Sequence, residues 1–170
     1  MGKLTDIAYY EWAYEFFNRE LFDGNLPTVR ITLMPNADYA GQFVPAFRIL
    51  NLNPKLFPHF QHREILATLV HEMCHCWQQR CGHPNPDNDH DEEWAGKMLE
   101  LGLRGDHWAA RAIVPDGRYD VAFQKLTVRA AEWESEWREQ QRRRKQEERL
   151  QRQVQRRREV RRQVERKWRY

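Results

Sequence analysis

Cysteine is scarce in this chain of 170 residues, and the three cysteines lie close together, as Cys74, Cys76 and Cys81. Such spacing does not fit the disulfide framework of a small secreted domain, and it favours a reducing compartment. The first residues, MGKLTDIAYYEW, lack the apolar run of a secretory signal. No stretch approaches the roughly 18 apolar residues of a membrane span. The sequence therefore predicts a cytoplasmic protein that is not secreted.

Glycine and proline are absent from residue 128 to the end of the sequence, and this segment is rich in Arg, Glu and Gln. Residues 138–170 contain 15 Lys and Arg against 5 Asp and Glu, which gives a net charge of +10. Because the whole chain carries +3, residues 1–137 carry −7. We expect a folded domain over 1–127 and a basic helical extension over 128–170, whose charge suits an acidic partner.

The segments of the first part follow from the spacing of its apolar residues. Helices are expected over 5–22, 61–80 and 90–103, and short strands over 28–34, 40–45 and 47–53. Pro45 between the last two strands favours an edge position. A turn and a short final strand are expected in VPDGRYDVAF. This pattern predicts an α+β fold with a small, mostly antiparallel sheet and one long Arg-rich helix at the C-terminus.

Residues 71–75 have the spacing His-Glu-x-x-His within the second expected helix. Side chains four apart on a helix point the same way, so His71 and His75 can offer imidazole nitrogens to one zinc ion. Glu72 is offset by about 100° around the helix, where it can reach a water molecule on the ion and act as a general base. The alternative is an ordinary amphipathic helix with two histidines on one side.

A catalytic zinc ion needs a third protein ligand as well as an open position. His90 is the best candidate, because it follows a loop and begins the next helix, from which its side chain can return to the first two histidines. The alternatives are nearby residues with metal-binding side chains: Cys81, His83, Glu92 and Glu93. His83 is less suitable, because it lies in a Gly-His-Pro turn.

Four segments in the same order resemble the SprT-like family of zinc metalloproteases, which includes the Spartan-type proteases, and they span about residues 1–103. They are ELFDGNLP after the first helix, AGQF with ILNLNPKLF, REILATLVHEMCHCWQ around the paired histidines, and HDEEWAGKMLELG. Five residues match the family's first motif: Asn18, Leu21, Phe22, Leu26 and Pro27. In the last segment, His90 stands in the ligand place and Trp94 where an aromatic residue is usual.

The resemblance implies a zincin-like fold, with one catalytic zinc ion on His71, His75 and His90 and with Glu72 as general base and acid. It also implies hydrolysis of peptide bonds, often in proteins that are attached to DNA. Many bacterial relatives carry a cysteine-rich zinc ribbon after the protease domain. This sequence has no cysteine after Cys81, and the Arg-rich helix stands where the ribbon would be.

Two further features of such an enzyme can be assigned only as candidates. A donor that stabilises the oxyanion is needed, and His83, His107, Arg118 and Tyr119 are the candidates. The protein substrate is expected to lie extended beside the strand over 40–45 and to add backbone hydrogen bonds. Such binding is weakly sequence-specific, so selectivity would have to come from recruitment.

The basic extension admits three interpretations. Its arginines can bind DNA phosphates, with Trp168 and Tyr170 stacking on unpaired bases, which would place the protein in a nucleoid or nucleus. Five apolar residues on one face of the helix can instead dock a protein partner: Leu150, Val154, Val160, Val164 and Trp168. The third interpretation is a solvated helix without a partner. Trp133 and Trp137 are expected to pack against the folded domain.

The first functional hypothesis is therefore a zinc endopeptidase that is recruited to DNA. One alternative is a non-catalytic binding module that zinc stabilises. Another is a protease with a narrow protein target, recruited through the C-terminal helix. Salt distinguishes the first hypothesis from the last, because phosphate binding weakens steeply with salt and apolar docking does not.

Overall fold

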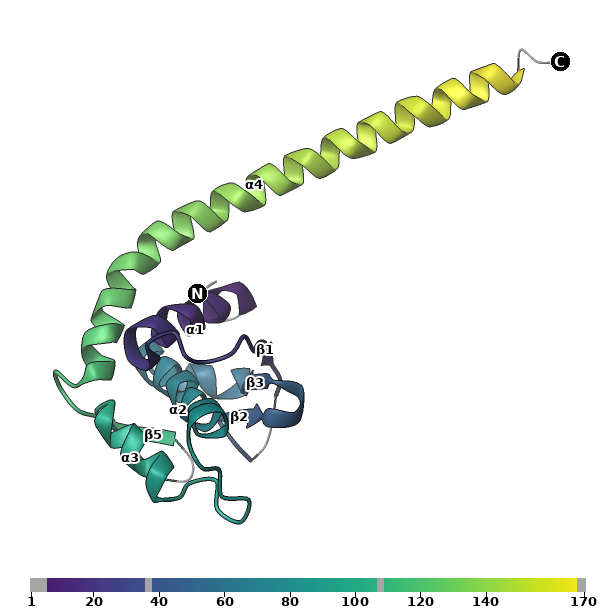
Figure 1. The fold of residues 1–170 in the computed structure, drawn as a ribbon. Coiled ribbons are helices and arrows are strands. Elements are labelled where there is room, and N and C mark those ends of the chain that lie inside the picture. Colours follow the sequence, from purple (N-terminus) through teal and green to yellow (C-terminus); the bar gives the residue numbers. More distant parts are fainter. Residues whose placement is uncertain (1–5, 36–37, 107–108, 168–170) are drawn as a thin grey trace. The chain divides into compact units, whose positions relative to one another are not determined.

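The structure is a computed structural model that describes residues 6–35, 38–106 and 109–167 (Figure 1). The chain divides into two compact units, Met1–Leu126 and Thr127–Tyr170. The division falls within the last helix, since α4 runs over Arg118–Lys167. None of the described helices combines the length and the apolar character that are needed to cross a membrane.

Within the described part of the first unit, three α-helices are complete: α1 (Ile7–Phe22), α2 (His62–Cys81) and α3 (Glu92–Glu100). Asp6 caps the start of α1, where its carboxylate accepts a hydrogen bond from the Ala8 backbone N–H at 3.0 Å. α2 begins with a capping box, in which the Gln61 backbone N–H donates to the Glu64 carboxylate at 2.6 Å. The helices expected from apolar spacing are thus present, with ends that differ by a few residues.

A three-stranded sheet with the order β1-β3-β2 is formed by β1 (Arg30–Leu33), β2 (Gly41–Val44) and β3 (Ile49–Leu52). β2 and β3 pair antiparallel across the short 3-10 helix Pro45–Phe47. β1 pairs with β3 in parallel, so the sheet is mixed rather than mostly antiparallel. The alternation within a strand shows which face is buried but not which neighbour it pairs with. Because β3 lies between β1 and β2, β2 lies at an edge of the sheet.

A second, two-stranded sheet lies where the sequence shows little pattern. β4 (Leu103–Asp106) pairs antiparallel with β5 (Ala109–Ile113). The strand expected within VPDGRYDVAF is wrong, because α4 already begins at Arg118. The Asp120 carboxylate accepts a hydrogen bond from the Asp116 backbone N–H at 3.0 Å, which caps this helix start. Tyr119 and Leu126 are fully buried, so the first turns of α4 belong to the core of the first unit.

α2 occupies the centre of the first unit. It contacts α1, α3, β2, β3 and β5, and Figure 1 shows it between the three-stranded sheet and α3. Because several sides of the helix are covered, some of its polar residues are buried with its apolar ones. His71 is 5% exposed and Glu72 is 4% exposed. Burying such groups is costly unless they have partners, so their surroundings indicate what they do.

Candidate metal centre

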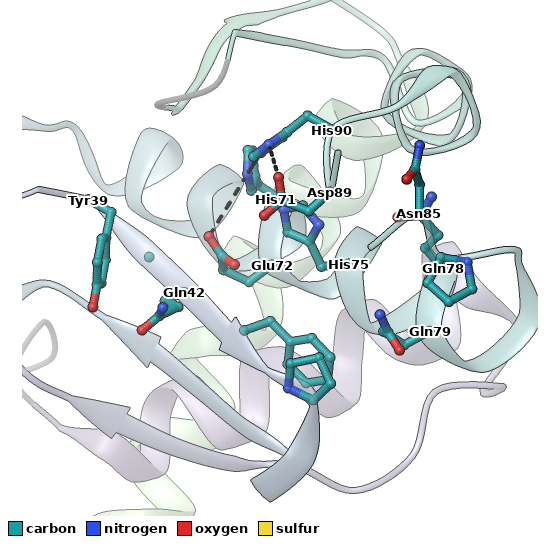
Figure 2. Close-up of a pocket in the computed structure, with 14 residues that line it drawn as sticks. Tyr39, Gln42, His71, Glu72, His75, Gln78, Gln79, Asn85, Asp89 and His90 are labelled. Atoms are coloured by element: carbon teal, nitrogen blue, oxygen red, sulfur yellow. Dashed lines mark hydrogen bonds and ion pairs between the residues drawn. The ribbon is translucent and has the colours of Figure 1, made fainter. Parts of the chain in front are cut away.

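Three imidazoles converge beside α2 (Figure 2). His71 and His75 lie one helical turn apart, with ring centroids separated by 5.1 Å. His90 comes from the loop before α3, and its Nε2 lies 3.2 Å from the Nε2 of His71. One ligand nitrogen from each of the three residues lies within 4.8 Å of the other two. This cluster could hold a metal ion.

The protonation of the cluster fits a cation. Burial, with smaller effects of His75 and His90, lowers the pKa of His71 to about 3. Burial and the neighbouring His90 lower the pKa of His75 to about 4. Both rings are therefore neutral at pH 7, and a neutral imidazole offers a lone pair to a metal ion. Three nitrogen donors of this kind suit zinc and related transition metals.

Asp89 orients two of the three imidazoles. Its carboxylate lies 2.9 Å from Nδ1 of His90, which favours the tautomer whose Nε2 carries the lone pair. Its backbone is hydrogen-bonded to His75. The sequence analysis missed this residue, although a carboxylate beside a candidate ligand is a signal that could have found it.

Trp94 packs against all three imidazoles. Its ring is stacked on His75, with centroids 5.2 Å apart and an interplanar angle of 17°. It meets His71 and His90 edge to face, at 4.7 and 4.4 Å between centroids. The side chain is 3% exposed, so it belongs to the buried face of α3. Packing of this kind limits the orientations that the three rings can adopt.

Glu72 lies next to the histidine cluster, with its Oε1 4.0 Å from the Nε2 of His71. Burial raises the pKa of Glu72 to about 8, and a hydrogen bond from the backbone of Phe43 on β2 opposes this increase. Without a cation nearby, the carboxyl group is therefore largely protonated at pH 7. A metal ion bound to the histidines would favour the ionised form of Glu72.

A cavity of about 270 Å³ opens over these residues. β2 and α2 line it together with the loop that leads to His90. In Figure 2, Tyr39 and Gln42 lie towards one end of the cavity, and Gln79 and Asn85 lie towards the other. Apart from Glu72 and Asp89, its lining carries neither acidic nor basic side chains other than the histidines.

The alternative third ligands lie elsewhere. The side chain of His83 is 96% exposed, and its Nδ1 lies 3.2 Å from Oε1 of Glu93. Glu93 also accepts a hydrogen bond from the His83 backbone at 2.6 Å. Cys81 and Glu92 are exposed. None of these four residues lines the cavity, whereas His90 does.

The three candidates for oxyanion stabilisation that lie within the described residues do not line the cavity either. The Tyr119 hydroxyl is buried and donates to the backbone oxygen of Arg63. Arg118 forms an ion pair with Glu100 at the surface. His83 is paired with Glu93 at the surface, and His107 lies outside the described residues. Among the residues that do line the cavity, Tyr39 carries a hydroxyl group.

The sequence matches the SprT-like family over residues 10–111, which is more than half of the chain. The chain therefore belongs to the SprT-like family. The match runs from α1 into β5 and includes all three histidines and Glu72. No curated protein matches the chain, and no solved structure does.

Proposed function

We propose that this SprT-like chain is a zinc-dependent endopeptidase with a zincin-like fold. The observation that supports it most is the convergence of three histidines beside a buried carboxylate, at the floor of an open cavity. His71, His75 and His90 would hold the zinc ion. A purely structural zinc site has four protein ligands, and the described cluster offers three, which favours catalysis over a non-catalytic binding module.

The chemistry would be divided between the ion and Glu72. When bound, zinc supplies Lewis acidity, which polarises a carbonyl oxygen and makes a water molecule a better acid. Glu72 takes the proton of the attacking water and passes it to the leaving amine. Its buried position suits this task, because its pKa of about 8 in the metal-free protein would fall towards neutrality beside a cation.

The substrate would be an extended segment of a protein that lies along β2. Among the strands that the structure describes, β2 pairs only with β3, and Gly41 and Phe43 line the cavity. A peptide could extend the sheet there through backbone hydrogen bonds. The uncharged polar side chains of Gln42, Gln79 and Asn85 around the cavity are compatible with many sequences.

We further propose that the helix of the second unit recruits the enzyme to DNA. Within this helix, every described side chain from Arg142 to Glu159 is exposed. Arg138 and Arg143 form ion pairs with Glu134 and Glu139 one turn earlier. The arginines that exceed the acidic residues give this helix a net positive charge, which suits binding to DNA phosphates. A protein partner is the alternative, since Leu150 and Val154 are 54% and 48% exposed on this helix.

The decisive experiment measures cleavage of an unfolded protein by the wild type and by Glu72→Gln, with the zinc content of both. We expect wild-type cleavage to depend on zinc, and Glu72→Gln to lose about 10²–10⁴-fold in rate while it retains zinc. Full activity of Glu72→Gln would reject Glu72 as the base. Wild type that binds zinc but cleaves nothing would favour a binding module or a narrow target.

Adding single-stranded DNA at several salt concentrations tests the recruitment. Stimulation that fades between about 50 and 200 mM salt supports phosphate binding. Recruitment that salt does not weaken would indicate a protein partner at the apolar side chains instead.

A further inference from the structure

Gly41 on β2 lies against the side chain of Glu72. A Cβ atom at Gly41 would come within 2.7 Å of Glu72 Oε1 and 2.9 Å of its Cγ. It would also lie 3.0 Å from Cγ2 of Thr68, one turn earlier on α2. The two Glu72 distances are shorter than Cβ contacts in real proteins. Any residue other than glycine at this position would therefore displace a neighbour.

The strand itself is held in place. The Asn53 backbone N–H donates to the backbone oxygen of Ala40 at 2.8 Å, and its side-chain amide donates to that of Tyr39 at 2.9 Å. Gly41 is paired with Leu52, which is fully buried. A retreat of β2 from α2 would break these bonds and disturb the core.

The Glu72 carboxylate can yield more easily than the strand. It is the end of a flexible side chain, and rotation about its own bonds is sufficient to move it. Its movement would break the hydrogen bond from the Phe43 backbone, which lies two residues along the same strand. Two features of β2 therefore fix the same carboxylate: Gly41 leaves room for it, and the N–H group of Phe43 donates a hydrogen bond to it.

We propose that Gly41 is a positioning residue for Glu72: by having no side chain, it lets β2 hold the carboxylate beside the histidine cluster. The role in catalysis rests on the proposed function of Glu72 as general base. The same short strand would thus bind the substrate backbone and fix the group that handles the proton. Close backbone approach is a common reason for glycine within a strand.

Gly41→Ala tests the catalytic consequence, with Gly96→Ala as the matched control, since a Cβ at Gly96 in α3 would meet nothing within 4 Å. We expect Gly41→Ala to lower kcat about 100-fold, as for a catalytic group misplaced by about 1 Å, while zinc per chain and KM change little. Gly96→Ala should keep wild-type kcat. Unchanged kcat in Gly41→Ala would overturn the proposal.

A second measurement does not depend on activity. Gly41→Ala should lower the melting temperature of the metal-free wild-type chain. In a chain that already carries Glu72→Ala, which lacks the Glu72 atoms that the new Cβ would meet, the same substitution should lower it much less. An equal decrease in melting temperature in both chains would overturn the proposal. If Gly41→Ala alone does not fold, the double variant with Glu72→Ala should fold, and its failure would count equally against the proposal. Wild type that cleaves nothing would favour a binding module or a narrow target, and the melting temperatures alone would then decide whether Gly41 positions Glu72.

Discussion

The candidate metal centre and the basic helix have their polar and charged groups in opposite environments. His71 and Glu72 are almost fully buried, and their protons are controlled by burial and by fixed neighbours. The arginines from Arg142 to Arg158 are all exposed to solvent. A site that depends on geometry is sensitive to small local changes, whereas a site that depends on net charge tolerates the loss of any one residue. Each prediction below tests one side of that difference.

The largest effect on stability is expected from Trp94→Ala. The ring is 3% exposed and touches all three imidazoles, so its removal leaves a cavity in the core under the metal centre. We expect a loss of about 3–5 kcal/mol in the free energy of unfolding, as for other buried aromatic residues. Zinc affinity should fall as well, because the rings lose the surface that orients them. Denaturant unfolding with and without zinc measures both, and a loss below about 1 kcal/mol would contradict the described packing.

The next effect concerns pH and Glu72 in the metal-free protein. Between pH 4.5 and 8, the unfolded chain has released this proton while the folded chain retains it, because the folded pKa is raised. Wild-type stability therefore falls as pH rises through this window, and Glu72→Gln removes that contribution. Relative to wild type, Glu72→Gln should gain about 2–4 kcal/mol between pH 5 and pH 8.

The histidines contribute with the opposite sign in the same protein. The folded pKa values of His71 and His75 are lowered, so their contribution is present above pH 6.5 and is lost as pH falls towards about 3 to 4. Both variants contain these histidines, so the comparison at each pH isolates Glu72. Bound zinc should reduce the advantage of Glu72→Gln, since a cation favours the ionised carboxylate. A difference that does not change with pH would contradict the buried environment of Glu72.

A smaller effect is expected from Asp89→Asn, with Asp87→Asn in the same loop as its control. Asp89 contacts His90 and His75, whereas Asp87 does not line the cavity. Removing the carboxylate that orients His90 should weaken zinc binding about 10–100-fold. Competition with a chelating dye measures the affinity. If zinc affinity falls equally in both variants, the loop acts through its overall charge and not through Asp89.

The smallest effect on the fold is expected from replacing Arg156, Arg157 and Arg158 by Gln. These side chains are exposed on the helix of the second unit, so the free energy of unfolding of the first unit should change by less than about 0.5 kcal/mol. Binding of single-stranded DNA should weaken, and its salt dependence should become less steep by about 0.7 for each phosphate contact that is lost. Unchanged DNA binding would place any contact elsewhere.

The sequence was most informative where a local pattern carries the structure. Apolar spacing predicted α1, α2 and α3, and the motif on α2 together with the loop before α3 predicted the cluster of His71, His75 and His90. The three helices are present, and the three histidines come together in the described structure. These are short-range features, because helical periodicity and the spacing of two histidines on one helix need no knowledge of distant segments.

The sequence was least informative where distant segments meet. The parallel pairing of β1 with β3, and the sheet of β4 and β5, depend on pairing that no single strand encodes. The contact between Gly41 and Glu72 joins residues far apart in the chain, so a glycine in a strand gave no signal of its own. Early turns of α4 were missed because Pro115, Asp116 and Gly117 indicate a turn, and the helix begins directly after it.

The most direct test of the central claim is the zinc content of purified wild type, His90→Ala and His83→Ala. The cluster predicts about one zinc ion per wild-type chain, retention of that ion in His83→Ala, and loss of most of it in His90→Ala. His83 is the suitable control because it lies in the same loop, exposed and outside the cavity. Wild type without zinc, or His90→Ala with the full amount, would contradict the assignment of the three histidines as the metal centre.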